Sequence, residues 1–175
     1  PFLEIFVQPA AGDAGGAYGI ASYIAHAIFR KPRVEKWQQA FWGPEYSDEE
    51  VRSVLDREGA VYEEWEENEL LREVAHRLAD GKVVGWVRGR MEFGPRALGH
   101  RSILADPRDP KMKDTVNLKI KFRETFRPFA PAVLEDRCSE YLELNQESPY
   151  MLLVAPVRLD HRTIPSVTHV DGSAR

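Results

Sequence analysis

A long stretch without helical or strand periodicity, residues 88–110, places the strongest constraint on how this chain can fold. It follows an apolar segment, residues 83–87, that predicts a strand, and it carries four arginines and three glycines between positions 89 and 108. Long loops in compact domains are usually functional or disordered, and the apolar side chains of Phe93 and Leu98 favour order. We therefore expect an ordered loop at the end of a strand, where open sheets commonly bind ligands.

The basic residues are concentrated around this loop, although the chain as a whole is acidic. The 175 residues carry 24 Lys and Arg against 28 Asp and Glu, a net charge of −4. Residues 82–131 alone hold 12 basic and 5 acidic side chains, which gives this stretch a net charge of +7. Such a concentration favours a multiply charged anion as partner, namely a phosphate, nucleotide or nucleic acid, with ordinary clumping of surface charge as the alternative.

Several classes of protein are excluded by composition. No run of roughly 18 apolar residues is present, so the sequence predicts no transmembrane helix, and the first residues do not resemble a signal peptide. The single Cys138 excludes a disulfide framework and a cysteine zinc site, and it suggests a reducing compartment such as the cytoplasm. The chain begins at Pro1 without an initiator methionine, which we interpret as the interior of a longer protein.

Helices and strands are predicted in irregular alternation, which indicates an α/β or α+β fold with a mixed sheet. Ser47 and Glu50 form a capping-box pattern at the start of a helix that ends near Gly59. The other expected helices span residues 20–29, 68–79, 112–121 and 135–142. The expected strands span residues 2–8, 60–63, 83–87, 129–134, 151–157 and 167–170.

A glycine-rich segment, residues 12–19, lies between the first expected strand and helix. Glycines at Gly15 and Gly16 would let the backbone approach a ligand closely, and a helix N-terminus favours an anion. Asp13 could cap the helix or bind a metal or a ribose. The spacing is neither that of a dinucleotide fingerprint nor that of a P-loop, and a purely structural turn is the alternative.

The arginines and lysines between positions 90 and 127 are candidate phosphate contacts, because guanidinium groups match pairs of phosphate oxygens. If residues 119–123 were a strand, their three cations would share one face, whereas a helix would scatter them. His100 is the best placed of the five histidines, and no histidine pair has tight ligand spacing, so a complete metal site is not predicted. The candidate basic residues are Arg90, Arg96, Arg101, Lys121, Arg123 and Arg127, with Ser102 as a further hydrogen-bond donor.

Five segments resemble the NodU/CmcH-type carbamoyltransferases. They are residues 8–17, 41–50, 89–104, 126–131 and 168–175, and the arginine-rich segment is the most specific of them. The resemblance implies that residues 1–30 are the last strand and helix of an actin-like, metal-binding domain that transfers a carbamoyl group. It further implies that residues 31–46 are a linker. Residues 47–175 would then be a C-terminally truncated YrdC-like domain, with a twisted mixed sheet and flanking helices.

The same resemblance implies a function. The YrdC-like domain would form carbamoyl adenylate from carbamoyl phosphate and ATP, and the carbamoyl group would pass to a hydroxyl of a small-molecule acceptor. Asp13 matches a ligand of a divalent metal, Fe or Mg, whose histidine ligands would lie upstream. Lys121 and Arg123, with Arg127, resemble the phosphate-binding pattern of YrdC-like domains. These three and His100 are the expected catalytic residues; Arg90, Arg96, Arg101, Ser102, Gly15 and Gly16 are the expected cofactor contacts.

The expected partners are small-molecule substrates and the N-terminal domain of the same polypeptide. Association with further copies of the same chain is an alternative that the sequence leaves undecided. Binding to a membrane is not expected. The basic stretch offers few aromatic side chains on which bases would stack, which disfavours nucleic acid. Two alternatives remain, a non-catalytic RNA- or nucleotide-binding module and an inactive fragment.

Overall fold

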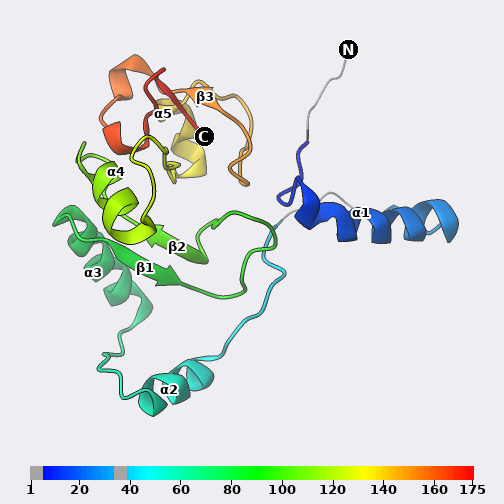
Figure 1. Ribbon diagram of the computed structural model, residues 1–175, viewed down its shortest axis with the longest axis horizontal. Coiled ribbons are helices and arrows are strands. Elements are labelled where there is room, and N and C mark those ends of the chain that lie inside the picture. The colour runs from blue at the N-terminus through cyan, green and yellow to red at the C-terminus, as the bar shows by residue number, and fades with distance from the viewer. Residues whose placement is uncertain (1–5, 34–38) are drawn as a thin grey trace.

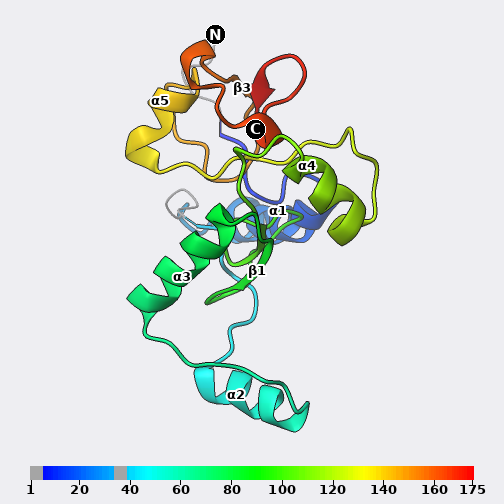
Figure 2. The same cartoon turned by 90° about the vertical axis from the view of Figure 1, so that its left-hand side faces the viewer.

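The computed structural model describes residues 6–33 and 39–175. Short helices, two small antiparallel sheets and long irregular connections make up this part of the chain (Figure 1). In both views helix α2 lies at one end, the C-terminal segment lies at the other, and the β1–β2 pair lies between them with α3 and α4 (Figure 2). Helix α1 projects sideways from this arrangement in Figure 1.

The first helical region begins earlier than the sequence predicts. A 3-10 turn η1 (Asp13–Gly15) leads into α1 (Gly16–Tyr23), which continues as a π-helix η2 (Ile24–Ile28). The predicted helix over residues 20–29 is thus confirmed and extended. Its apolar side chains are largely exposed, including Ile20, Tyr23 and Phe29. Most of the strand expected over residues 2–8 lies outside the described residues.

The two acidic helices match their predictions. Helix α2 (Asp48–Arg57) begins at the predicted cap. The Glu50 N–H donates to the Ser47 hydroxyl oxygen, and the Ser47 N–H donates to the Glu50 carboxylate. Helix α3 (Glu67–Ala79) ends near the positive-φ residue Gly81 and lies against β1. The strand predicted over residues 60–63 is wrong: Val61 is fully exposed, and this segment pairs with no strand among the described residues.

The predicted strand after α3 is present, and it has a partner that the sequence analysis missed. Strand β1 (Val84–Val87) pairs antiparallel with β2 (Arg101–Leu104), with Val84 opposite Leu104 and Val87 opposite Arg101. The expected loop over residues 88–110 is therefore interrupted by a strand. Only the tertiary pairing with β1 distinguishes the Arg-Ser-Ile-Leu sequence of β2 from loop.

The helix predicted over residues 112–121 is confirmed as α4 (Met112–Thr115) followed by a π-helix η3 (Val116–Lys121). Val116 and Asn117 are buried on its inner side. The helix ends at Phe122, whose φ of 49° is left-handed. Because the segment is helical, its lysines do not share one strand face.

The main apolar core lies in the C-terminal third of the chain. A 3-10 turn η4 (Glu135–Arg137) and helix α5 (Cys138–Tyr141) confirm the predicted short helix, and they are followed by β3 (Ala155–Pro156), η5 (Leu159–His161), η6 (Pro165–Val167) and β4 (Ser173–Ala174). The buried core residues come from these elements and their connections: Leu142, Ala155, Val157, Ile164, Val167 and Ala174.

Three strand predictions in this region are wrong or too long. Residues 129–134 form no strand, since Pro131 lacks an N–H donor and nothing in the part of the chain that the structure describes pairs with them. Only Ala155–Pro156 of the expected strand over 151–157 pairs with another strand. Pro165 begins a 3-10 turn where residues 167–170 were expected to be extended, and a turn at Gly172, with φ of 84°, shifts the strand to Ser173–Ala174.

The described residues combine helices with small sheets, as expected for an α+β chain. Both sheets have two antiparallel strands, so the described part of the chain does not contain the expected mixed sheet. No helix in the described ranges is long and apolar enough to cross a membrane.

Candidate functional site

The predicted basic residues fall in two regions of the chain. We call residues 88–101, between β1 and the start of β2, the arginine loop, and residues 121–129, after η3, the basic turn. The arginine loop contains Arg90, Arg96, His100 and Arg101, and the basic turn contains Lys121, Arg123 and Arg127. Ser102 lies one residue beyond the arginine loop, in β2.

A buried carboxylate organises the arginine loop. Glu92 is 8% exposed, and its Oε1 accepts hydrogen bonds from the backbone N–H groups of Leu98 at 2.7 Å, His100 at 2.8 Å and Arg101 at 3.2 Å. Burial raises the pKa of Glu92, but these backbone hydrogen bonds together outweigh burial and lower it below its ordinary value. Glu92 is therefore an ionised internal anion that folds the loop back on itself.

The Arg101 side chain binds backbone carbonyl groups of the same loop. Its Nη1 donates to the carbonyls of Arg88 at 2.8 Å and His100 at 2.7 Å, and its Nη2 donates to the carbonyl of Gly89 at 3.1 Å. Three of the guanidinium N–H groups are thus committed to the loop backbone. The structure assigns Arg101 a role in holding the loop.

His100 is held by a hydrogen bond and by a stacking contact. Its Nδ1 lies 2.6 Å from the carbonyl oxygen of Arg90, and since a carbonyl only accepts, Nδ1 carries the proton. The ring stacks on Phe41 with centroids 3.7 Å apart and planes 12° apart. His100 therefore connects the arginine loop to the predicted linker.

Backbone hydrogen bonds join the predicted linker to the arginine loop. The Gly43 N–H donates to the Met91 carbonyl at 2.8 Å, and the Met91 N–H donates to the Pro44 carbonyl at 2.8 Å. The Phe93 ring lies 5.9 Å from that of Trp42, which in turn lies 5.9 Å from that of Tyr18 in α1. Phe41 and Trp42 thus pack the predicted linker against the arginine loop, and Trp42 also against α1.

Residues 9 and 10, just before the glycine-rich segment, also pack on this loop. Gly94 has φ of 122°, and a Cβ there would lie 2.9 Å from the Pro9 carbonyl oxygen. Gly15 is buried, and a Cβ on it would collide with the Ala10 carbonyl. Gly15 therefore serves close packing within its own turn, while Gly16 is exposed at the start of α1.

Two arginines of the loop keep their guanidinium groups unengaged. Arg90 and Arg96 make no side-chain hydrogen bond or ion pair within residues 6–33 and 39–175, and the Nε of Arg96 is buried without a partner. The Ser102 hydroxyl accepts from the Gly99 N–H at 3.0 Å. Arg90 and Arg96 are therefore the residues of this loop that are most available to an anion.

The basic turn is organised by a buried amide. Asn117 is 0% exposed, its Nδ2 donates to the Arg127 carbonyl at 3.0 Å, and its Oδ1 accepts from the Arg123 Nε at 2.6 Å. The Arg123 guanidinium lies over the Phe129 ring, 4.8 Å from its centroid, in cation–π geometry. Arg123 is thus held from two sides, and neither of its Nη groups has a partner among the described residues.

The other cations of the basic turn are exposed. Lys121 ends η3 and has no partner in the described ranges. The Arg127 Nε forms an ion pair with Glu124 at 2.9 Å, with about half of each side chain exposed.

Asp13 does not belong to a metal cluster in this structure. It is exposed at the start of η1, and it caps neither η1 nor α1 through its side chain. Across the residues that the structure describes, no three His, Cys, Asp or Glu side chains are grouped to hold a metal ion. A single carboxylate is too few protein ligands for a typical metal site, so the described residues do not fit one.

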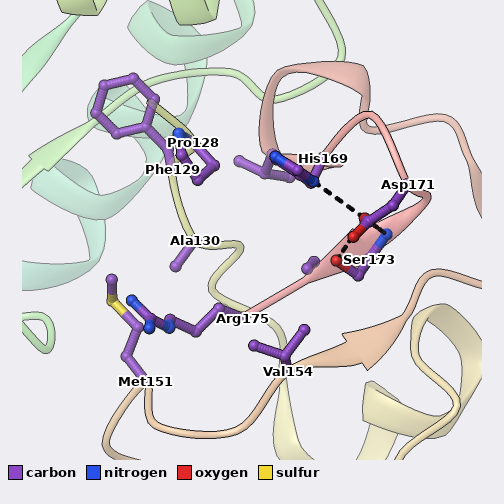
Figure 3. A pocket seen from close by; sticks show the side chains of 11 residues that line it. Pro128, Phe129, Ala130, Met151, Val154, His169, Asp171, Ser173 and Arg175 are labelled. Carbon is purple, nitrogen blue, oxygen red and sulfur yellow. Dashed lines mark hydrogen bonds and ion pairs between the residues drawn. The ribbon is translucent and has the colours of Figure 1, made fainter. Parts of the chain in front are cut away.

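A cavity lies beside the basic turn, within the C-terminal third (Figure 3). It measures about 330 Å³ and is lined by Pro128, Phe129, Ala130, Met151, Val154, Val167, His169, Asp171, Ser173, Ala174 and Arg175. Phe129 lines this cavity, and the Arg123 guanidinium lies over the Phe129 ring. None of the predicted site residues lines this cavity or the second one, which is bordered by residues of α3 and β1.

One wall of this cavity carries a small polar network (Figure 3). Asp171 Oδ1 accepts from the Ser173 hydroxyl at 2.7 Å and from the Ser173 N–H at 2.9 Å, and it lies 3.1 Å from His169 Nδ1. The hydrogen bonds from Ser173, and then that from His169, lower the pKa of Asp171 to about 2. Asp171 is therefore ionised across the physiological pH range.

Sequence reasoning missed the two side chains that organise these regions, Glu92 and Asn117. Glu92 is an acidic residue within the most basic part of the chain, which is the one signal that could have singled it out. Asn117 carried no such signal, because an asparagine in a helix is ordinarily a surface residue.

Comparison with known proteins agrees with the resemblance. Residues 75–175 match the family described as Carbamoyltransferase C-terminus. The nodulation protein NolNO of Sinorhizobium fredii is 48% identical over 179 residues, which cover 99% of this chain and 26% of NolNO. The nodulation protein NolO of Bradyrhizobium diazoefficiens is 42% identical over 179 residues, covering 99% of this chain and 33% of NolO.

A nodulation protein U of Rhizobium fredii is 40% identical over 182 residues, covering 99% of this chain and 28% of that protein. The chain thus spans about a quarter to a third of the length of these curated relatives. With the family match covering more than half of its residues, this chain belongs to the NodU-type carbamoyltransferase family and contains the C-terminal region of that family.

Proposed function

We propose that the intact protein is an O-carbamoyltransferase, and that this region, as a YrdC-like domain, forms carbamoyl adenylate from carbamoyl phosphate and ATP. The observation that carries the proposal is the Arg123 guanidinium. Asn117 and Phe129 hold it in place, and its Nη groups have no partner among the described residues. A fixed guanidinium with free donors is suited to a phosphate, and it lies within the region that matches the carbamoyltransferase family.

The proposed reaction has three steps. Water cleaves carbamoyl phosphate to carbamate and inorganic phosphate. A carbamate oxygen then attacks the α-phosphorus of ATP, so that a P–O bond forms and pyrophosphate leaves. In the third step an acceptor hydroxyl attacks the carbamoyl carbon, loses its proton and displaces AMP. Carbamate is unstable in water, so the first two steps require a site that positions the anions and excludes solvent.

The chain's own residues divide into those that would bind and those that would hold them in place. Arg90, Arg96, Lys121 and Arg123 have donors that no described residue occupies, and we assign them to the phosphate and carbamoyl oxygens. Their positive charge would neutralise charge that develops on phosphoryl oxygens in the transition state. Arg101 and His100 would position the arginine loop through its carbonyl groups. Arg127 would become available by exchanging Glu124 for the ligand.

In this proposal the acceptor site and the actin-like, metal-binding domain, apart from residues 1–30, belong to the rest of the polypeptide. Asp13 would contribute one carboxylate there, and no step is assigned to a metal, because the described residues do not form a site for one.

Carbamoyl-phosphate-dependent exchange of labelled pyrophosphate into ATP, measured on the full-length protein, tests the proposal. Lys121→Ala and Arg123→Ala should each reduce exchange by about tenfold or more, since a charge-assisted contact contributes about 1.5–3 kcal/mol. Arg137→Ala is the matched control, because Arg137 forms an exposed ion pair with Glu140 and should leave exchange unchanged. Exchange at the wild-type rate in both Lys121 and Arg123 variants would refute the assignment.

One observation favours a second function, binding of single-stranded RNA. Phe122 is 84% exposed and Phe126 is 72% exposed, and both alternate with cations of the basic turn. These two positions supply exposed aromatics in a stretch where the sequence predicts few of them. Bases can stack on such side chains while cations meet the backbone phosphates. A salt-dependent gel shift with single-stranded RNA at physiological ionic strength that is lost in Phe122→Ala would support this function, and its absence would refute it.

A further inference from the structure

Glu92 is a buried charge with no cation beside it. No ion pair to Glu92 forms within the described residues, and its compensation comes from the three backbone N–H groups of Leu98, His100 and Arg101. All three donate to the same oxygen, Oε1. A buried carboxylate is costly unless it is satisfied in this way, so its presence fixes the path of the chain from residue 92 to residue 101.

Arg101 and His100 hold the backbone carbonyl groups of the same loop. The Arg101 guanidinium donates to the carbonyls of Arg88, Gly89 and His100, and His100 donates to that of Arg90. The backbone donors of the loop thus face an anion, while its backbone acceptors face a cation and an imidazole. Loss of either organising group would free the segment between them.

The loop backbone held by Glu92, Arg101 and His100 carries the side chains of Arg90 and Arg96. Arg90 lies two residues before Glu92, and Arg96 lies inside the turn that Glu92 closes. Neither guanidinium has a partner in the part of the chain that the structure describes, and the Nε of Arg96 is buried without one. A buried guanidinium N–H without a partner is costly and points to an acceptor that the ligand supplies.

We propose that Glu92 is a positioning residue which, through the backbone of residues 98–101, holds Arg90 and Arg96 for a phosphate or pyrophosphate oxyanion. This inference rests on the proposed function and deepens it, because it names the residue that prepares the arginine loop for its anion. Glu92 itself does not touch the ligand.

Pyrophosphate is the probe, and its binding to the full-length protein is measured by calorimetry without any turnover. Glu92→Ala should weaken binding by about tenfold, the scale of one lost charge-assisted contact. Glu92→Gln keeps an acceptor oxygen of the same shape, so it should recover most of the affinity. It also serves if the alanine variant fails to fold. Glu64→Gln is the matched control, because Glu64 is an exposed partner of Arg52 and should bind as wild type does.

A double-mutant comparison separates positioning from general destabilisation. In an Arg96→Ala background, Glu92→Ala should cost less affinity than it does in the wild type, because one of the contacts it prepares is already gone. Amide hydrogen exchange at Leu98, His100 and Arg101 should accelerate in Glu92→Ala and stay slow in Glu64→Gln.

Three results would overturn the inference: absent pyrophosphate binding in the wild type, equal fold losses in both backgrounds, or unchanged protection of the three amides. Pyrophosphate binding that depends on Glu92 in an enzyme without ATP–pyrophosphate exchange would support the positioning role. That same result would refute the proposed adenylation, so the two failures are distinguishable.

Discussion

Replacing Asn117 by alanine should loosen the basic turn more than any exposed substitution near it. The Asn117 side chain is fully buried, and it bonds to Arg123 on one side and to the Arg127 carbonyl on the other. Alanine removes both contacts and leaves a half-buried carbonyl and a half-buried guanidinium N–H without these partners. Leaving such groups unsatisfied costs free energy in proportion to how far they are withdrawn from water.

The magnitude follows from the two bonds. The bond to the Arg127 carbonyl at 3.0 Å joins neutral groups and contributes about 1 kcal/mol, whereas the bond from Arg123 at 2.6 Å involves a charge and contributes about 2 kcal/mol. The longer contact with the Thr125 carbonyl, at 3.4 Å, adds little. The local free energy of opening should therefore fall by about 3 kcal/mol.

Native-state hydrogen exchange on the full-length protein reports this local free energy directly from amides of residues 116–129. Asn145→Ala is the control, since Asn145 is exposed in an irregular segment. Asn117→Asp separates the two bonds, because it keeps an acceptor for Arg123 and places an oxygen against the Arg127 carbonyl, so it should fall between the wild type and the alanine variant. Exchange in Asn117→Ala within about 0.5 kcal/mol of the wild type would show that Asn117 does not organise the turn.

Two further predictions concern the carboxylate at the cavity and the turn of the arginine loop. The Asp171 carboxyl should titrate near pH 2 in a carbon-detected NMR titration, below its ordinary value of 3.8. Its contribution to stability is therefore complete above pH 3.8 and is lost as the pH falls through about 2; titration at 3.8 would contradict the network with Ser173 and His169. Gly94→Ala should lower the thermal midpoint, because Gly94 has φ of 122° and a Cβ there would meet the Pro9 carbonyl. Gly85→Ala, whose Cβ meets nothing within 4 Å, is the control, and equal midpoints would contradict the packing.

Elements with local signals were predictable from the sequence. The capping box at Ser47 and Glu50 satisfies the first turn of α2 by itself, and the helix from Met112 to Lys121 follows from composition and the absence of breakers. Strand β2 was not predictable in the same way. Its residues are extended because they pair with β1. The paired residues are separated in sequence by the whole arginine loop, so no local pattern predicts the pairing.

The candidate site residues stay predictions, although the structure shows what holds several of them in place. The arginine-rich segment was correctly identified as an ordered loop, since Glu92 and Arg101 hold it. The sequence could not divide its arginines into free and committed groups, because that division depends on whether a carbonyl or Asn117 lies within reach of each guanidinium. The expected convergence of all six cations on one cavity stays a prediction.

The backbone pairing of Gly43 and Pro44 with Met91 has a practical consequence for anyone expressing parts of this protein. A recombinant piece that starts at Ser47, the predicted domain border, would lose the segment that is hydrogen-bonded to Met91, together with the aromatic ring under His100. Expression boundaries are better drawn upstream of Ala40, so that the purified material retains the scaffold on which its arginines rest.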